Sequence, residues 1–129
     1  MATPPDSEAK QSDILKDRTQ RFALRIIKMY RALPRTEEAH IIGKQLLRSG
    51  TSIGANYRAA CRGRSRAEFV AKLGVVLEEA DETVFWLELL REAGVFSEPK
   101  LRVILVEAKE LVAIFVASMR TAKGATSAI

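Results

Sequence analysis

The arginines are the residues of this sequence whose type and spacing could do chemistry. Five of them lie within one short part of the chain: Arg48, Arg58, Arg62, Arg64 and Arg66. On an ideal helix, which turns by about 100° per residue, the first three fall on the side away from the apolar stripe, and the last two continue that basic end. Guanidinium donates paired hydrogen bonds to phosphate and keeps its charge. This group is therefore one candidate surface for phosphate-bearing ligands.

Two alternative roles are open to the same arginines. Charged side chains opposite a core are what a solvated helix face carries. Carboxylates of another subunit could also pair with them, although exposed pairs stabilise by only about 0.2–1 kcal/mol each. The composition leaves ligand, solvent and neighbouring subunit open. The carboxylates in question are Glu78, Glu79, Asp81 and Glu82.

A second basic group, Arg21, Arg25 and Lys28, shares one flank of the first predicted helix. The net charge is +5, and it is unevenly distributed: residues 35–66 hold seven basic and two acidic residues, whereas 67–93 hold two and seven. The first half of the chain therefore favours anionic partners, RNA or DNA. Because Tyr57 is the only aromatic residue among the arginines, we expect no sequence-specific reading of bases.

The sequence lacks the residue sets that catalysis or metal binding would need. Helical bundles hold two metal ions between pairs of Glu-x-x-His motifs, but Glu37 and His40 form one such motif and His40 is the sole histidine. Cys61 is the sole cysteine, which excludes a disulfide within the chain and a cysteine metal cluster. No phosphate-binding loop and no nucleophile motif occurs. We expect no enzyme activity, no cofactor and no metal.

The elements that must position these residues are four helices. Apolar residues recur at alternating spacings of about three and four, and strand signals are absent. This pattern predicts an all-α, antiparallel up-and-down four-helix bundle over residues 13–123, with a disordered N-terminal tail at 1–12 and a flexible C-terminal tail at 124–129. The expected helices run from about Asp13 to Leu33, from after Thr36 to before Gly63, from Ser65 to Gly94, and from after Ser97 onwards.

The sequence predicts residence in the cytoplasm and no membrane partner. No apolar run approaches the roughly 20 residues that a membrane-spanning helix needs, and the N-terminus lacks the apolar segment of a signal peptide.

Three polar residues are expected to have structural roles. Ser65 and Glu68 have the spacing of a capping box, in which each side chain bonds the other residue's backbone N–H. Asn56 falls on the predicted inner stripe of the second helix, where an unbonded buried amide would cost about 1–3 kcal/mol. We therefore expect Asn56 to set the register of helix packing. Small residues on the same stripe predict the close approach of a neighbouring helix.

Several apolar residues fall outside the predicted inner stripes. Leu24 and Ile27 lie opposite the stripe of the first helix, and Val75, Trp86 and Leu89 lie off the stripe of the third. Such residues are costly to leave together in water, which predicts a subunit interface. The alternative is that the core of four helices is wide enough to reach them.

One long segment resembles a known family. The run QLLRSGTSIGANYRAACRGRSRAEFVAKLGVVLEEADETVFWLELL, residues 45–90, resembles four-helix bundle proteins related to those encoded by intervening sequences in bacterial 23S ribosomal RNA genes. The resemblance extends over about residues 17–120. The commoner branch of that family reads Asn-Ile-Ala-Glu-Gly after the Ser-Ile pair, whereas this chain reads NYRAAC, like a second branch.

The resemblance implies an assembly as well as a fold. The family is similar in fold to the accessory protein of diversity-generating retroelements, a homopentameric barrel whose basic surface binds nucleic acid and a reverse transcriptase. It implies a homopentameric ring and transfers no catalytic residue. We expect a non-enzymatic homo-oligomer that binds RNA or other nucleic acid through its basic surface. The alternative is a protein-interaction scaffold that binds no nucleic acid.

Overall fold

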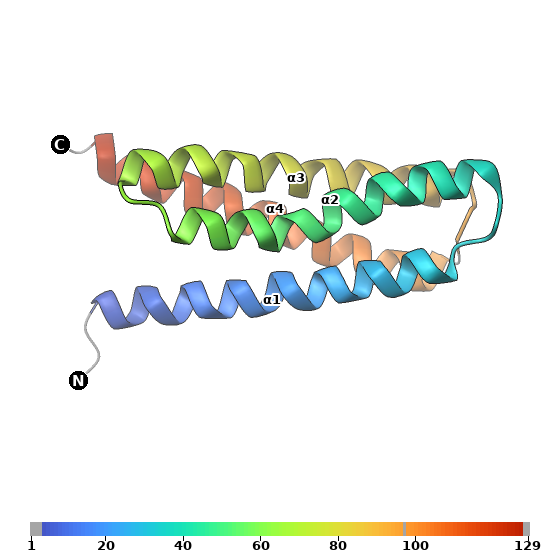
Figure 1. Cartoon of the computed structure of the whole chain (residues 1–129), viewed down its shortest axis with the longest axis horizontal. Helices are drawn as coiled ribbons and strands as arrows, with labels where there is room; N and C mark the ends of the chain where they lie inside the picture. Colours follow the sequence, from blue (N-terminus) through green and yellow to red (C-terminus); the bar gives the residue numbers. More distant parts are fainter. Residues whose placement is uncertain (1–3, 97, 128–129) are drawn as a thin grey trace.

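The computed structural model consists of four long α-helices lying side by side (Figure 1). It describes the backbone of residues 4–96 and 98–127 and the side chains of residues 10–96 and 99–124. No strand occurs in that part of the chain, so the predicted all-α four-helix fold is confirmed. The helices are α1 (Pro4–Ala32), α2 (Glu37–Cys61), α3 (Arg66–Glu92) and α4 (Glu98–Ser127).

The helices do not contact one another equally. α1 packs on α2, α2 on α3 and α3 on α4, whereas α1 and α4 meet at few points. The four helices therefore make three tight contacts between consecutive helices and one looser contact, or seam, between the first and the last.

Among the described residues, no helical stretch has the length and apolar character that spanning a bilayer requires.

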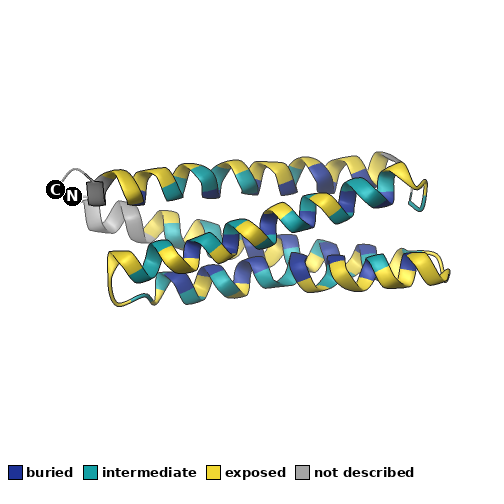
Figure 2. Ribbon diagram, turned by 90° about the horizontal axis from the view of Figure 1, so that it is seen from above, coloured by how far each residue is buried: buried dark blue, intermediate teal, exposed yellow. Residues whose placement is uncertain are grey.

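The core follows the predicted stripes, which place buried residues on the inner side of every helix (Figure 2). Phe22, Ile26 and Met29 of α1 are buried, and the buried residues of the other helices include Leu46, Ile53, Leu73, Leu87, Leu101 and Phe115. The predicted stripes did not include the whole core. A helix that packs between two neighbours buries a wider face than a single stripe of residues spaced three and four apart. The additional buried apolar residues include Val76, Leu90, Ile104 and Leu111.

Glycines bring α2 against α1. A Cβ atom built on Gly50 would lie 2.9 Å from Cγ1 of Ile26, and one on Gly54 would lie 3.1 Å from Oγ1 of Thr19. Thr19 is fully buried and donates its hydroxyl proton to the Leu15 carbonyl, 2.8 Å away in its own helix. The predicted close approach of a neighbouring helix is confirmed, and it depends on α2 having no side chains at these positions.

The predicted role of Asn56 is not what the structure shows. Tyr57, rather than Asn56, occupies the inner stripe and packs its ring 5.5 Å from that of Phe115; its burial raises the pKa of Tyr57 to about 12. Asn56 is half-buried and donates to the Ser52 carbonyl in its own helix, at 2.9 Å. The rotation of a long helix moves position 56 away from the core, so this amide crosses to no other helix.

A hydroxyl pair provides the buried polar contact between α2 and α3. Ser49 and Thr83 are both fully buried, and their hydroxyl oxygens are hydrogen-bonded at 3.0 Å. Each hydroxyl also lies within hydrogen-bond distance of a carbonyl of its own helix, Leu46 for Ser49 and Glu79 for Thr83. Since a hydroxyl left unbonded in the core is costly, this pair favours one register of α2 on α3.

The helix ends follow local sequence signals, with one difference in detail. Thr36, directly before α2 as expected, caps it by accepting from the backbone N–H of Ala39. Ser65 likewise caps α3 by accepting from the N–H of Glu68 at 3.1 Å. The Glu68 carboxylate, however, accepts from the N–H of Arg64 instead of Ser65. The first bond of the predicted capping box is therefore present, and the second is made by the backbone N–H of the preceding residue.

Two boundaries differ from the expected ones. α1 begins at Pro4, so residues 4–12 are helical where a tail was expected, and α4 continues to Ser127. Proline fits the first turn of a helix because the N–H it lacks has no partner there. The Ser12 hydroxyl lies 3.3 Å from the Cys61 sulfur, so α1 still contacts α2 at this end. Ser97, expected just before the fourth helix, lies outside the described residues.

We predict that Gly50→Leu lowers the free energy of unfolding by about 1–3 kcal/mol, because its side chain collides with Ile26. Gly74→Ala is the matched control: its Cβ would lie an ordinary 3.7 Å from the Met119 methyl, and alanine stabilises a helix by roughly 0.5–1 kcal/mol over glycine. Urea unfolding followed by circular dichroism measures both. Equal midpoints for Gly50→Leu and wild type would contradict the tight α1–α2 contact.

Candidate nucleic-acid interface

The predicted cluster of five arginines is not one surface. Arg48 lies over the α2–α3 seam, where its guanidinium donates to both oxygens of Glu79 at 3.0 and 3.1 Å and to Glu82. The Ser52 hydroxyl adds a further bond to Glu79 at 3.0 Å. Arg48 therefore pairs with the acidic helix that was considered as its partner, but within its own chain.

The remaining arginines of that group lie elsewhere. Arg58 donates to the side-chain carbonyl of Gln20 at 2.8 Å, across the α1–α2 seam. Arg62, Arg64 and Arg66 are exposed at the α2–α3 turn and have no carboxylate within ion-pair distance in the described part of the chain. These three form a positively charged group at one end of the bundle, separate from Arg48.

The residues of the second predicted basic group do lie on one surface. Arg21, Arg25 and Lys28 of α1 line a shallow groove along the loose seam with α4, which adds Lys100. We call it the α1–α4 groove; it consists of two adjoining hollows of about 400 and 390 Å³ that share Arg25 and Lys28. Its remaining lining residues are Arg18, Phe22, Leu24 and Glu107 in one hollow, and Met29, Ala32, Phe96, Val103 and Ile104 in the other.

An ion pair spans the seam beside this groove. The Arg18 guanidinium donates to both oxygens of Glu107 at 2.7 Å, and more weakly to Glu110 at 3.3 Å. The hydrogen bonds that Arg18 donates to Glu107 hold the pKa of Arg18 well above its usual range. Glu107 is the one carboxylate among the groove's described lining residues, and Arg18 neutralises it.

Part of the positive charge of the groove has no carboxylate partner among the described residues. Arg21 is paired with Asp17 at 2.8 Å, but both side chains are mostly exposed, and such pairs are weak. Among the residues that the structure describes, Arg25, Lys28 and Lys100 have no carboxylate within 4.0 Å. Lys100 could not be assigned to this group from sequence, because only the fold brings α4 beside α1.

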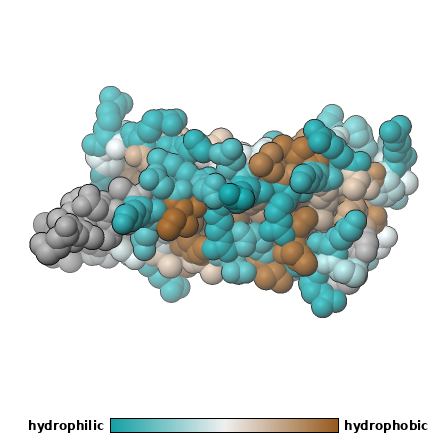
Figure 3. Space-filling view, turned by 90° about the horizontal axis from the view of Figure 1, so that it is seen from below, coloured by the Kyte–Doolittle hydropathy of each residue, from teal (hydrophilic) through white to brown (hydrophobic). Residues whose placement is uncertain are grey.

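The predicted interface residues are partly exposed. Leu24 and Val75 are exposed, whereas Ile27 and Leu89 are half-buried. Trp86 packs against the core cluster and donates its indole N–H to Glu82 at 3.1 Å. Figure 3 shows one face of the molecule, on which hydrophobic groups lie between hydrophilic side chains. Exposed apolar residues that the prediction omitted are Ile14, Ile41, Phe85, Val103 and Val106.

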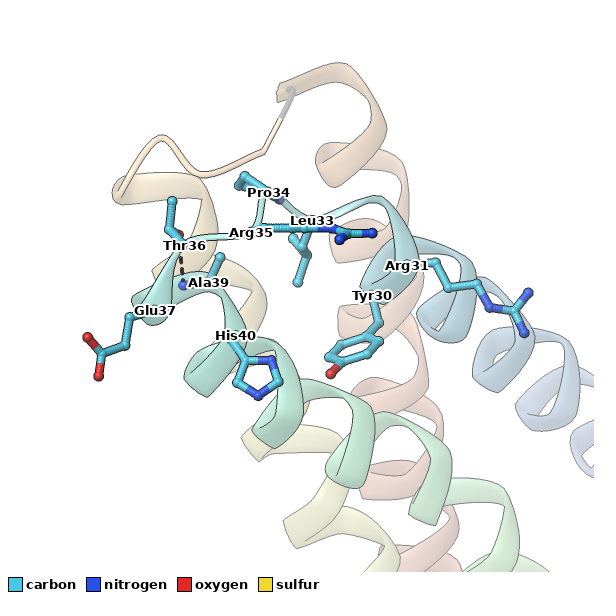
Figure 4. A pocket seen from close by; sticks show the side chains of 9 residues that line it. All are labelled: Tyr30, Arg31, Leu33, Pro34, Arg35, Thr36, Glu37, Ala39 and His40. Carbon is cyan, nitrogen blue, oxygen red and sulfur yellow. Dashed lines mark hydrogen bonds between the residues drawn. The ribbon is translucent and has the colours of Figure 1, made fainter.

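A third hollow, of about 530 Å³, lies at the α1–α2 connection (Figure 4). The rings of Tyr30 and His40 line it, while the Glu37 carboxylate points away from His40. Within the described residues, no three His, Cys, Asp or Glu side chains gather as a metal would need. This hollow therefore assembles no set of groups for metal chemistry.

Comparison with known proteins identifies the family. Residues 11–117 match the family model of the 23S rRNA-intervening sequence protein. The chain belongs to this family. The family match includes the whole of α2 and α3 and every α1 cation of the groove. The expected resemblance is thereby confirmed.

This chain is also similar in structure to a solved protein. It is a protein of unknown function from the S23 ribosomal protein family of Bacteroides thetaiotaomicron VPI-5482, 37% identical to this chain. The match covers 84% of this chain and 97% of that one, with a TM-score of 0.78. No curated protein matches the chain.

We predict that acid weakens the bundle partly through Glu82. Hydrogen bonds from Trp86 and Arg48 lower the pKa of Glu82 below its ordinary 4.5, so the stability it adds is present above that pH and is lost as pH falls through the folded-state value. Glu82→Gln should lower the free energy of unfolding near neutral pH by roughly 0.2–1 kcal/mol. It should also make the decrease of stability with falling pH, the acid limb of the stability curve, less steep. Urea midpoints measured from about pH 7 to about pH 3 test this.

Glu78→Gln serves as the control for this measurement. Glu78 lies on the same helix, is exposed and has no ion-pair partner in the described chain. If the two variants show the same acid limb, the Arg48 network does not contribute to it.

Proposed function

We propose that this antiparallel up-and-down bundle is a non-enzymatic homo-oligomer that binds RNA through the α1–α4 groove. The observation that carries the proposal is the alignment of Arg25, Lys28 and Lys100, from two helices, with no carboxylate partner among the described residues. Arg21 extends the same row of charge. The family model's description, as an intervening-sequence protein of 23S rRNA, agrees with an RNA ligand.

Phosphate is the ligand group that this groove suits best. Guanidinium and ammonium groups donate to phosphate oxygens, and the spacing of charges along α1 follows an extended anion better than a compact one. Each phosphate bound releases condensed counterions, so affinity for a single strand falls with salt by about 0.7 logarithmic units per phosphate. Binding should therefore be salt-sensitive and largely independent of sequence.

We predict that Arg25→Glu with Lys28→Glu weakens RNA binding at least tenfold and reduces the salt slope by about 0.7 for each phosphate that the variant no longer binds. The matched control is Arg64→Glu with Arg66→Glu, which makes the same change of net charge at the far α2–α3 turn and should retain affinity and slope. Fluorescence anisotropy of a labelled RNA strand, titrated at several salt concentrations, measures both.

Two results would contradict this assignment. Equal decreases in affinity for the two double variants would mean that diffuse positive charge, rather than the groove, attracts RNA. If wild type binds no RNA at any salt concentration yet remains oligomeric, the protein-interaction scaffold becomes the better function.

The oligomer is proposed as a ring of five, which the family resemblance implies. Exposed apolar residues on α1 and α3, Leu24 and Val75, offer the contact surface. We predict a solution mass five times 14.3 kDa by light scattering, and a smaller mass for Leu24→Asp with Val75→Asp. Ala55→Asp, at an exposed position of α2, is the control and should leave the mass unchanged. A monomeric wild type would overturn this assembly.

A further inference from the structure

The half of the α1–α4 groove nearest the α3–α4 connection has an apolar floor. Met29 of α1 and Ile104 of α4 form the floor and are almost fully buried. Phe96, half-buried, enters from the connection, and Val103 is 61% exposed at the edge. The other half of the groove, around the Arg18–Glu107 pair, has no aromatic residue among its described lining residues except the buried Phe22.

The cations surround this apolar floor. Arg25, Lys28 and Lys100 line the same hollow of about 390 Å³, and the hollow contains no carboxylate among its described lining residues. A ligand that fills it must therefore present an apolar surface and negative charge together. An uncharged protein surface on the floor would leave the charges at its edge without an anionic partner, and any of them that it removed from water would be destabilised.

We propose that this half of the groove takes an unpaired nucleobase, so that the RNA bound is single-stranded. The base would pack against Phe96 and Val103, the accessible apolar side chains of the hollow, above Met29 and Ile104. Its flanking phosphates would reach Arg25, Lys28 and Lys100. The inference rests on the proposed function, because it names the kind of RNA that the same groove binds.

Strand state decides whether the floor is used. In a single strand the bases are free to leave the backbone and stack on aromatic or apolar side chains, whereas in a duplex they are stacked on one another and the protein meets mainly phosphate and sugar. Stacking is tolerant of sequence, since every base has a flat face. One base pocket therefore adds affinity for single strands without sequence-specific recognition.

The test compares strands of equal length. Wild type should bind a short labelled oligouridylate more tightly than a duplex RNA. Phe96→Ala should reduce affinity for the single strand by about fivefold or more, while duplex affinity and the salt slope stay unchanged. Lys100→Gln should weaken both complexes and lower the salt slope. Phe85→Ala removes an exposed ring on α3 that does not line the groove, and should change neither complex.

The outcomes separate this inference from the proposed function. Equal wild-type affinity for strand and duplex, or an effect of Phe96→Ala that is the same for both, overturns the base pocket and leaves the basic groove standing. If wild type binds neither RNA, the proposed function itself fails. Phe96→Leu preserves most of the apolar volume without the ring, so it gives the same comparison if Phe96→Ala lowers the unfolding midpoint.

Discussion

The close contact between α1 and α2 is the constraint on which the rest of the structure depends. Gly43, Gly50 and Gly54 leave room for side chains of α1 and of Leu33 just after it, which any Cβ atom would meet at 2.7–3.1 Å. The helices approach until the branched side chain of Ile26 rests almost on the backbone of α2. Because interiors are packed to near-crystalline density, that approach fixes the position of α1 relative to the remaining helices.

The looseness of the opposite seam follows from this tightness. Since α1 is held against α2, it meets α4 at few points, and the α1–α4 groove lies between them. The Arg18–Glu107 pair joins the two helices and removes the groove's one described carboxylate from competition with an anionic ligand. Helix packing on one side of the bundle thus leaves a cationic surface on the other.

The sequence was a good guide to helices and a poor guide to neighbours. Apolar spacing identified four helices, most of the core and the caps at Thr36 and Ser65, because these features depend on local geometry. It placed Arg48 on an outer face correctly but could not show that Glu79 of the same chain lies beside that face. Because small angular errors add up along a long helix, the sequence placed Asn56 in the core where the structure has Tyr57. Nothing in the sequence indicated that Lys100 would lie beside Arg25, because only the fold brings them together.

The order in which these contacts can form follows from their separation along the chain. The three tight helix pairs join consecutive helices across short turns, so forming them closes only short loops. The Arg18–Glu107 pair joins residues 89 positions apart and therefore closes a much longer loop. Loop closure costs more entropy as the loop lengthens, and contacts between near neighbours form fastest. We therefore expect contacts between consecutive helices to form first during folding, and the contact between α1 and α4, beside the groove, to form last.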